Sequence, residues 1–192
     1  MNQKRNQKPG RKVNQKYDPY IKFLAQVIKT YTATTPHYIY KDNNLLAEKN
    51  VVFRNLATHE DYIAIHFEWV IYTKYFQNKS GAAKEQVGVE IHVERFKDAN
   101  QIKESQNIFN HLLAASSTFP GGFQSGPNVP PARLGCHHIY VLKDYVSPIA
   151  PHTINWAVTK MIEFQNYFIP ILGNLYNQGV IKSGSPNFAK WP

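Results

Sequence analysis

The chain has a single cysteine, Cys136, and no long apolar run. One cysteine cannot form an intramolecular disulfide, which excludes a disulfide scaffold and fits a reducing compartment. No stretch of about 18 apolar residues is present, and the first residues lack the apolar segment of a signal peptide. We therefore expect an intracellular protein, most simply a cytoplasmic one, that does not contact a membrane.

Familiar chemical signatures are also missing from the sequence. There is no Gly-rich phosphate loop that ends in Gly-Lys-Ser/Thr, no His-Glu-x-x-His zinc motif and no zinc-deaminase signature. The RNP string of RNA-recognition modules is absent as well. The sequence therefore assigns no catalytic class by motif.

The length and composition predict one folded domain with two extensions. The 192 residues are 43% hydrophobic and 14% aromatic, which is sufficient for one well-buried core. We expect a flexible basic arm over residues 1–16, a single globular domain over 17–182, and an irregular tail over 183–192.

Acidic residues are absent from the first 16 positions, which carry +6 of the chain's formal net charge of +9. The rest of this segment is mostly Asn, Gln, Pro and Gly, which cannot bury themselves. A flexible basic arm attracts polyanions by releasing their counterions. It therefore predicts contact with nucleic acid, with a purely solubilising tail as the alternative. The residues expected to contribute are Lys4, Arg5, Lys8, Arg11, Lys12 and Lys16, with Tyr17 at the junction to the domain.

Apolar periodicity places helices and strands along the domain. Asp18 and Pro19 predict a helix start, and a stripe from Tyr20 to Tyr31 gives that helix a buried face. Further elements are strands at 38–40, 51–55, 62–72, 87–94 and 134–142, a helix capped by Asp98, and a loop over 119–133. Pro151 opens a long apolar helix that Pro170 should kink or end. This order predicts an α+β fold, with about three helices on a mixed, largely antiparallel sheet that contains a long central hairpin.

The hairpin over residues 62–96 carries the sharpest candidate site. Strand alternation places His66 and Glu68 on one face of the first strand, and Glu90, His92 and Glu94 on the matching face of the second. A turn centred near Gly81 would place Glu68 near Glu94 and His92 near Val70. These side chains could bind Mg²⁺ or Mn²⁺, or raise one another's pKa for acid–base work. The alternative is a polar sheet face that is simply exposed to water.

The element order over residues 18–143 resembles the core of the restriction-endonuclease-like fold. Enzymes of that family place an acid on the second core strand and Glu-x-Lys on the third. Here the second strand offers Asp61 or Glu68, and the third reads Glu90-Ile91-His92, with His where Lys is expected. The resemblance is therefore one of topology, and it lacks the specific motif.

Cys136-His137-His138 is a further candidate, either as a nucleophile or as a metal site. Strand alternation sends His137 and His138 to opposite faces, so they cannot easily serve one site. A lone cysteine next to a strand is usually packing material. We therefore expect no function at Cys136.

Three functions remain in order of expectation. The first is a non-enzymatic nucleic-acid-binding or assembly protein that uses its basic arm. The second is a metal-dependent hydrolase or divergent nuclease, in which Glu68, Glu90, His92 and Glu94 hold the ion or act as acid and base, with His66 as a helper. The third is a regulatory subunit that associates with a protein partner or with itself through the apolar helix over residues 154–168.

Overall fold

In the computed structural model, the residues described are 15–35, 43–48, 51–56, 63–72, 85–95, 99–120, 122–127, 136–144 and 150–181. They form a short 3-10 helix, η1 (Gln15–Tyr17), three α-helices and six strands. The helices are α1 (Asp18–Thr34), α2 (Ala99–Ser116) and α3 (Pro151–Asn177). The strands are β1 (Asn43–Glu48), β2 (Val51–Leu56), β3 (Ile63–Tyr72), β4 (Gln86–Arg95), β5 (Gln124–Pro127) and β6 (Cys136–Asp144).

The six strands form one sheet in the order β1-β2-β3-β4-β6-β5. Every pairing between these strands is antiparallel. The predicted α+β class, with three helices and a long central hairpin, is confirmed. The sheet was predicted to be mixed, whereas among the described strands it has no parallel pair. The hairpin is β3–β4, and β6 pairs with β4 on its other side.

The register of the hairpin differs from the predicted one. Glu68 lies opposite Glu90 rather than Glu94, and His92 lies opposite His66 rather than Val70. Paired residues are symmetrical about Lys79 instead of Gly81. Because this change moves each partner by an even number of residues, every side chain stays on its predicted face.

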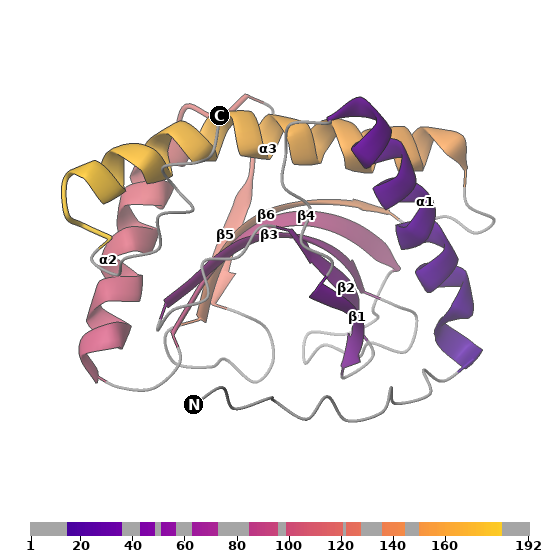
Figure 1. Ribbon diagram of the computed structural model, residues 1–192, viewed down its shortest axis with the longest axis horizontal. Coiled ribbons are helices and arrows are strands. Elements are labelled where there is room, and N and C mark those ends of the chain that lie inside the picture. Colours follow the sequence, from indigo (N-terminus) through magenta and orange to yellow (C-terminus); the bar gives the residue numbers. More distant parts are fainter. Residues whose placement is uncertain are drawn as a thin grey trace, which may run out of the picture.

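The three helices pack against the same face of the sheet. Trp69 on β3 donates its indole N–H to the carbonyl of Ala157 on α3, at 3.0 Å. On the same face, Tyr31 of α1 meets Trp69 edge to face, and Phe109 of α2 stacks on His137 of β6. Figure 1 shows α3 crossing the length of the sheet, with α1 and α2 at its two sides.

Helix α1 buries the predicted stripe, and its start differs by one residue. The buried residues are Tyr20, Phe23, Leu24, Val27 and Tyr31. The N-cap is Tyr17 rather than Asp18, and it makes no side-chain capping bond, so Asp18 lies in the first turn. Its acidic charge there still suits the positive end of the helix dipole.

Helix α3 begins at Pro151, as predicted, and continues through Pro170 to Asn177. Proline removes one backbone hydrogen bond from a helix. The residues on both sides of Pro170 are buried, including Phe168, Ile169, Leu172 and Leu175. Their packing on the core offsets the lost bond. Of the predicted kink or end at Pro170, the end is not observed. The apolar face of α3 is covered by the chain's own core.

The remaining predicted segments either differ from the structure or lie outside the described residues. Strand β1 was not predicted. Strand β5 lies inside the segment 119–133, which was predicted as a loop, and it forms because Gln124–Pro127 pairs with β6. The predicted strand at 38–40, the Asp98 cap, residues 1–14 of the arm and the tail at 183–192 lie outside the described residues. Among the described helices, none has the length and apolar character needed to cross a membrane.

Candidate metal centre

Six side chains from three neighbouring strands form two rows across the sheet. His66, His92 and His138 pair in register as one row, and Glu68, Glu90 and Tyr140 pair as the next. We call these six residues the His/Glu grid. Residues that alternate with them, such as Trp69 and Ile91, face the helices. The grid therefore occupies the sheet face that points away from α1, α2 and α3.

The grid is buried except for Tyr140, which is partly exposed. Glu90 is 1% exposed and His138 2%, while His66, Glu68 and His92 are 4–5% exposed. The expectation of a water-exposed polar face is therefore wrong. Buried carboxylates need compensating partners, because loss of hydration disfavours their charged form.

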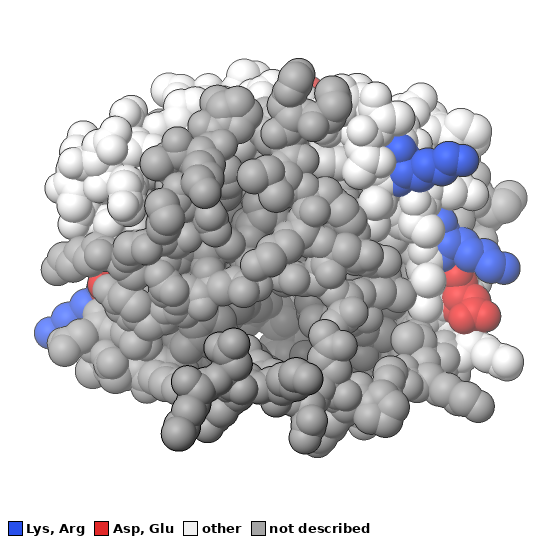
Figure 2. Space-filling model, viewed as in Figure 1, with Lys and Arg blue, Asp and Glu red and all other residues white. Residues whose placement is uncertain are grey.

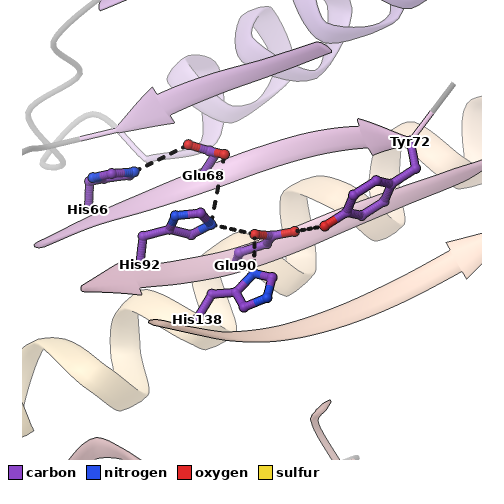
Figure 3. A network of polar contacts seen from close by, with 6 residues as sticks. All are labelled: His66, Glu68, Tyr72, Glu90, His92 and His138. Atoms are coloured by element: carbon purple, nitrogen blue, oxygen red, sulfur yellow. Dashed lines mark hydrogen bonds and ion pairs between the residues drawn. The ribbon is translucent and has the colours of Figure 1, made fainter. Parts of the chain in front are cut away.

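Glu90 is the centre of the hydrogen-bond network. Its Oε2 accepts from Nε2 of His92 at 2.5 Å and from Nδ1 of His138 at 2.9 Å. Its Oε1 accepts from the hydroxyl of Tyr72 at 3.1 Å. Figure 3 shows these three side chains converging on one carboxylate from β3, β4 and β6. Both oxygens of Glu90 are thereby satisfied.

Glu68 makes longer contacts within the same network. Its Oε2 lies 3.2 Å from Nε2 of His66, and its Oε1 lies 3.9 Å from Nε2 of His92. The ring of His92 stacks on that of His66, with centroids 5.1 Å apart, and meets that of His138 edge to face at 5.2 Å. His92 therefore stands between two carboxylates and between two imidazoles.

The environment sets the ionisation of the central groups. Burial alone would raise the pKa of Glu90, but the hydrogen bonds and the charges of His138 and His92 outweigh it and bring the pKa well below its usual range. Burial and the neighbouring Glu90 raise the pKa of Tyr72 above its ordinary value. The pKa of Tyr140 is raised for the same two reasons. Glu90 is therefore a charged acceptor, and Tyr72 is a neutral donor.

Two nitrogen atoms of the grid have no hydrogen-bond partner within the described part of the chain. They are Nδ1 of His66 and Nε2 of His138, and both are buried. Among the described residues, the ion pairs of Glu68 and Glu90 are all with histidines. No Lys or Arg among them therefore compensates the two facing carboxylates.

The grid contains two groups of three residues whose ligand atoms could surround one metal ion. The first is Glu90, His92 and His138, and the second is His66, Glu68 and His92. Within each group the ligand atoms lie within 4.8 Å of one another. Imidazole suits Zn²⁺, Fe²⁺ and Ni²⁺, whereas Mg²⁺ and Mn²⁺ favour oxygen ligands. Two histidines per group therefore favour Zn²⁺, Fe²⁺ or Ni²⁺ over the predicted Mg²⁺ or Mn²⁺.

The predicted hairpin residues are only partly brought together. His66, Glu68, Glu90 and His92 share the grid. Glu94 pairs with Ala64 and Cys136, one row beyond His92, and its side chain lies outside the described residues.

Sequence reasoning missed His138, which completes the tighter group. Its separation from His137 was predicted correctly: His138 contacts Glu90, whereas His137 stacks on Phe109 with centroids 4.8 Å apart. Burial and the neighbouring His138 lower the pKa of His137. The signal that could have identified His138 is the alternation of side chains along Cys136-His137-His138. Alternation places one of the two histidines on the polar face of the sheet, whichever strand this segment pairs with.

The predicted nucleic-acid contacts fall mostly outside the described part of the chain. This applies to Lys4, Arg5, Lys8, Arg11 and Lys12, and to the side chain of Lys16. Tyr17 is buried in the core at 8% exposure. In Figure 2, the basic side chains of the described residues lie in two separate places, one on the α1 side of the view and the other on the α2 side. On this face they form no continuous basic patch.

No family model, curated protein or solved structure matches this chain. The resemblance to the restriction-endonuclease-like core therefore gains no support from these comparisons.

Proposed function

We propose that the protein binds one divalent transition-metal ion through Glu90, His92 and His138. The observation that carries this proposal is the burial of two carboxylates directly opposite each other. Glu68 and Glu90 pair in register on β3 and β4, and neither is more than 5% exposed. Like charges in such a pair destabilise a sheet. A divalent cation among the histidines would compensate them.

The geometry of the first group supports the proposal. Nitrogen and oxygen ligands lie about 2.0–2.2 Å from Zn²⁺, so two ligands of one ion are about 3–3.5 Å apart. The nitrogens of His92 and His138 lie 2.5 and 2.9 Å from Oε2 of Glu90. Opening these contacts by roughly half an ångström would admit an ion, which would replace the protons that now join Glu90 to the two rings.

Three protein ligands leave a coordination position for water, as in catalytic zinc sites. Such an ion acts as a Lewis acid and lowers the pKa of its bound water. Glu68 is the other carboxylate of the grid. It lies on the adjacent strand, β3, and contacts His66. This arrangement supports the hydrolase alternative, with Glu68 as the proton acceptor and an ester or phosphodiester as the substrate class.

The first experiment is a titration of metal-free protein with Zn²⁺ by calorimetry, followed by thermal unfolding. We expect one ion per chain. At a free Zn²⁺ concentration 100 times the dissociation constant, binding stabilises the fold by about 2.7 kcal/mol. For a domain of this size that is a rise of roughly 5–10 °C in Tm.

The matched variants are His92→Ala and His111→Ala. His92 belongs to both metal-ligating groups, whereas His111 is exposed on α2. We expect His92→Ala to abolish Zn²⁺ binding and His111→Ala to bind as the wild type does. Equal Zn²⁺ binding by all three proteins, or none by the wild type, contradicts the proposal. Turnover of an activated phosphodiester by the zinc-loaded protein would separate a catalytic ion from a purely structural one.

Nucleic-acid binding by residues 1–16 is a second proposal that rests on a separate observation. These residues carry six basic and no acidic side chains. The charge supports attraction to any polyanion and names no sequence or type of nucleic acid.

A further inference from the structure

We infer that the grid offers the same ion a second, alternative position, formed by His66, Glu68 and His92. This inference rests on the metal binding proposed above. The three residues are each at most 5% exposed. Nε2 of His66 lies 3.2 Å from one oxygen of Glu68, and Nε2 of His92 lies 3.9 Å from the other. Two imidazoles and one carboxylate are the same ligand types as at the first position.

His92 makes the two positions exclusive of each other. It lies on β4, the middle strand of the three, directly opposite His66 on one side and His138 on the other. The same atom, Nε2, faces Oε2 of Glu90 and Oε1 of Glu68. One imidazole nitrogen has one lone pair and binds one ion. Two ions at once would leave one of them with only two protein ligands, so the grid holds a single ion.

The first position is the preferred one. The contacts of Glu90 with His92 and His138 are 2.5 and 2.9 Å, shorter than the 3.2 and 3.9 Å contacts around Glu68. Tyr72 also holds Oε1 of Glu90, which leaves Oε2 directed at the two rings. Hydrogen-bonded ligands of this kind bind metal more tightly than unsupported ones. An ion displaced from the first position finds three ligands at the second without leaving the protein.

The test uses Co²⁺, whose visible absorption reports the number and type of its ligands. The proteins are the wild type, His66→Ala, His138→Ala and the double variant of both. We expect one Co²⁺ per chain in the first three. His66→Ala should keep the wild-type spectrum. His138→Ala should bind roughly 10- to 100-fold more weakly and give a different spectrum. The double variant should lose measurable binding.

The other possible results contradict different parts of the proposal. Absence of Co²⁺ binding by the wild type overturns the proposed function itself. If the wild type binds and His138→Ala does not, the second position is refuted. Two ions per chain refute the shared role of His92. Retained binding by the double variant refutes the two ligand sets, because it shows that the ion needs neither His66 nor His138. Circular dichroism checks the fold, and His138→Phe, which keeps a ring of similar size, replaces His138→Ala if the latter unfolds.

Discussion

Replacing Glu90 with Gln separates the charge of this residue from its hydrogen bonds. The carboxylate accepts from His92 and His138 through Oε2 and from Tyr72 through Oε1. A Gln side chain has the same shape. Its carbonyl oxygen can accept from both histidines, and its NH₂ group can donate to the hydroxyl oxygen of Tyr72. All three contacts therefore survive, and only the negative charge is lost.

The expected change in metal-free stability is small. A hydrogen bond to a charged group contributes about 1.5–3 kcal/mol and a neutral one about 0.5–1.5 kcal/mol. Neutralising Glu90 therefore weakens its two histidine contacts by about 2 kcal/mol in total. The same change removes a buried charge and its repulsion with the facing Glu68, which offsets part of that loss. We expect a net destabilisation below about 2 kcal/mol.

The expected change in metal affinity is the more direct readout. Glu90→Gln removes the carboxylate of the first position and leaves the ion the second position, formed by His66, Glu68 and His92. Zn²⁺ should therefore bind roughly 10- to 100-fold more weakly. This corresponds to about 1.4–2.8 kcal/mol of binding free energy. The assays are urea unfolding of metal-free protein and calorimetric titration with Zn²⁺. Glu163→Gln serves as control, because the ion pair that Glu163 forms among the described residues is with Lys160 on α3, outside the grid. Unchanged Zn²⁺ affinity in Glu90→Gln would show that Glu90 is not a ligand of the ion.

The pH dependence of metal-free stability gives a second readout. The pKa of Glu90 in the folded protein lies below its ordinary value of 4.5. Its charge therefore contributes stability that is present above about pH 4.5 and is lost as the pH falls further. Glu90→Gln has no such group, so the difference in stability between the two proteins should shrink below pH 4.5. A constant difference across that range contradicts the low pKa.

Three further changes have defined outcomes. Tyr31→Phe leaves the buried Oε1 of Gln165 without its 2.7 Å partner. Urea unfolding should therefore show a loss of about 1–3 kcal/mol in the free energy of unfolding, and a smaller loss in a Gln165→Met background. Gly88→Ala places a Cβ 2.7 Å from the side chain of Val70 and 2.8 Å from that of Leu142. These two side chains must move, so stability should fall by about 1–3 kcal/mol, and an unchanged Tm contradicts the close approach. Deleting residues 1–16 removes six basic side chains. A plot of the logarithm of the binding constant for double-stranded DNA against the logarithm of the salt concentration should therefore become less steep, its slope changing by about five. An unchanged slope excludes the arm as the contact.

Alternation along the chain predicted β3, β4 and the shared face of His66, Glu68, Glu90 and His92. It could not set the register, because pairing depends on the length of the turn, which alternation does not report. It also could not show that this face is buried, because polar alternation looks the same on a wet face and on a covered one.

His138 could not be placed from the sequence alone. It enters the grid because β6 pairs with β4, and a helix and another strand separate these two along the chain. Pro170 illustrates a different limit. Its local preference predicts a helix end, whereas burial of Phe168 and Leu172 on either side extends the helix.

The two rows of the grid join parts of the chain that are far apart in sequence, from His66 to His138. No fragment that lacks β6 contains the tighter ligand set, so high-affinity coordination has to follow assembly of the three central strands. A bound ion would then slow global unfolding rather than local fraying. In hydrogen exchange, its addition should retard the amides of β3, β4 and β6 together, and leave the outer turns of α1 and α2 exchanging at their own rates.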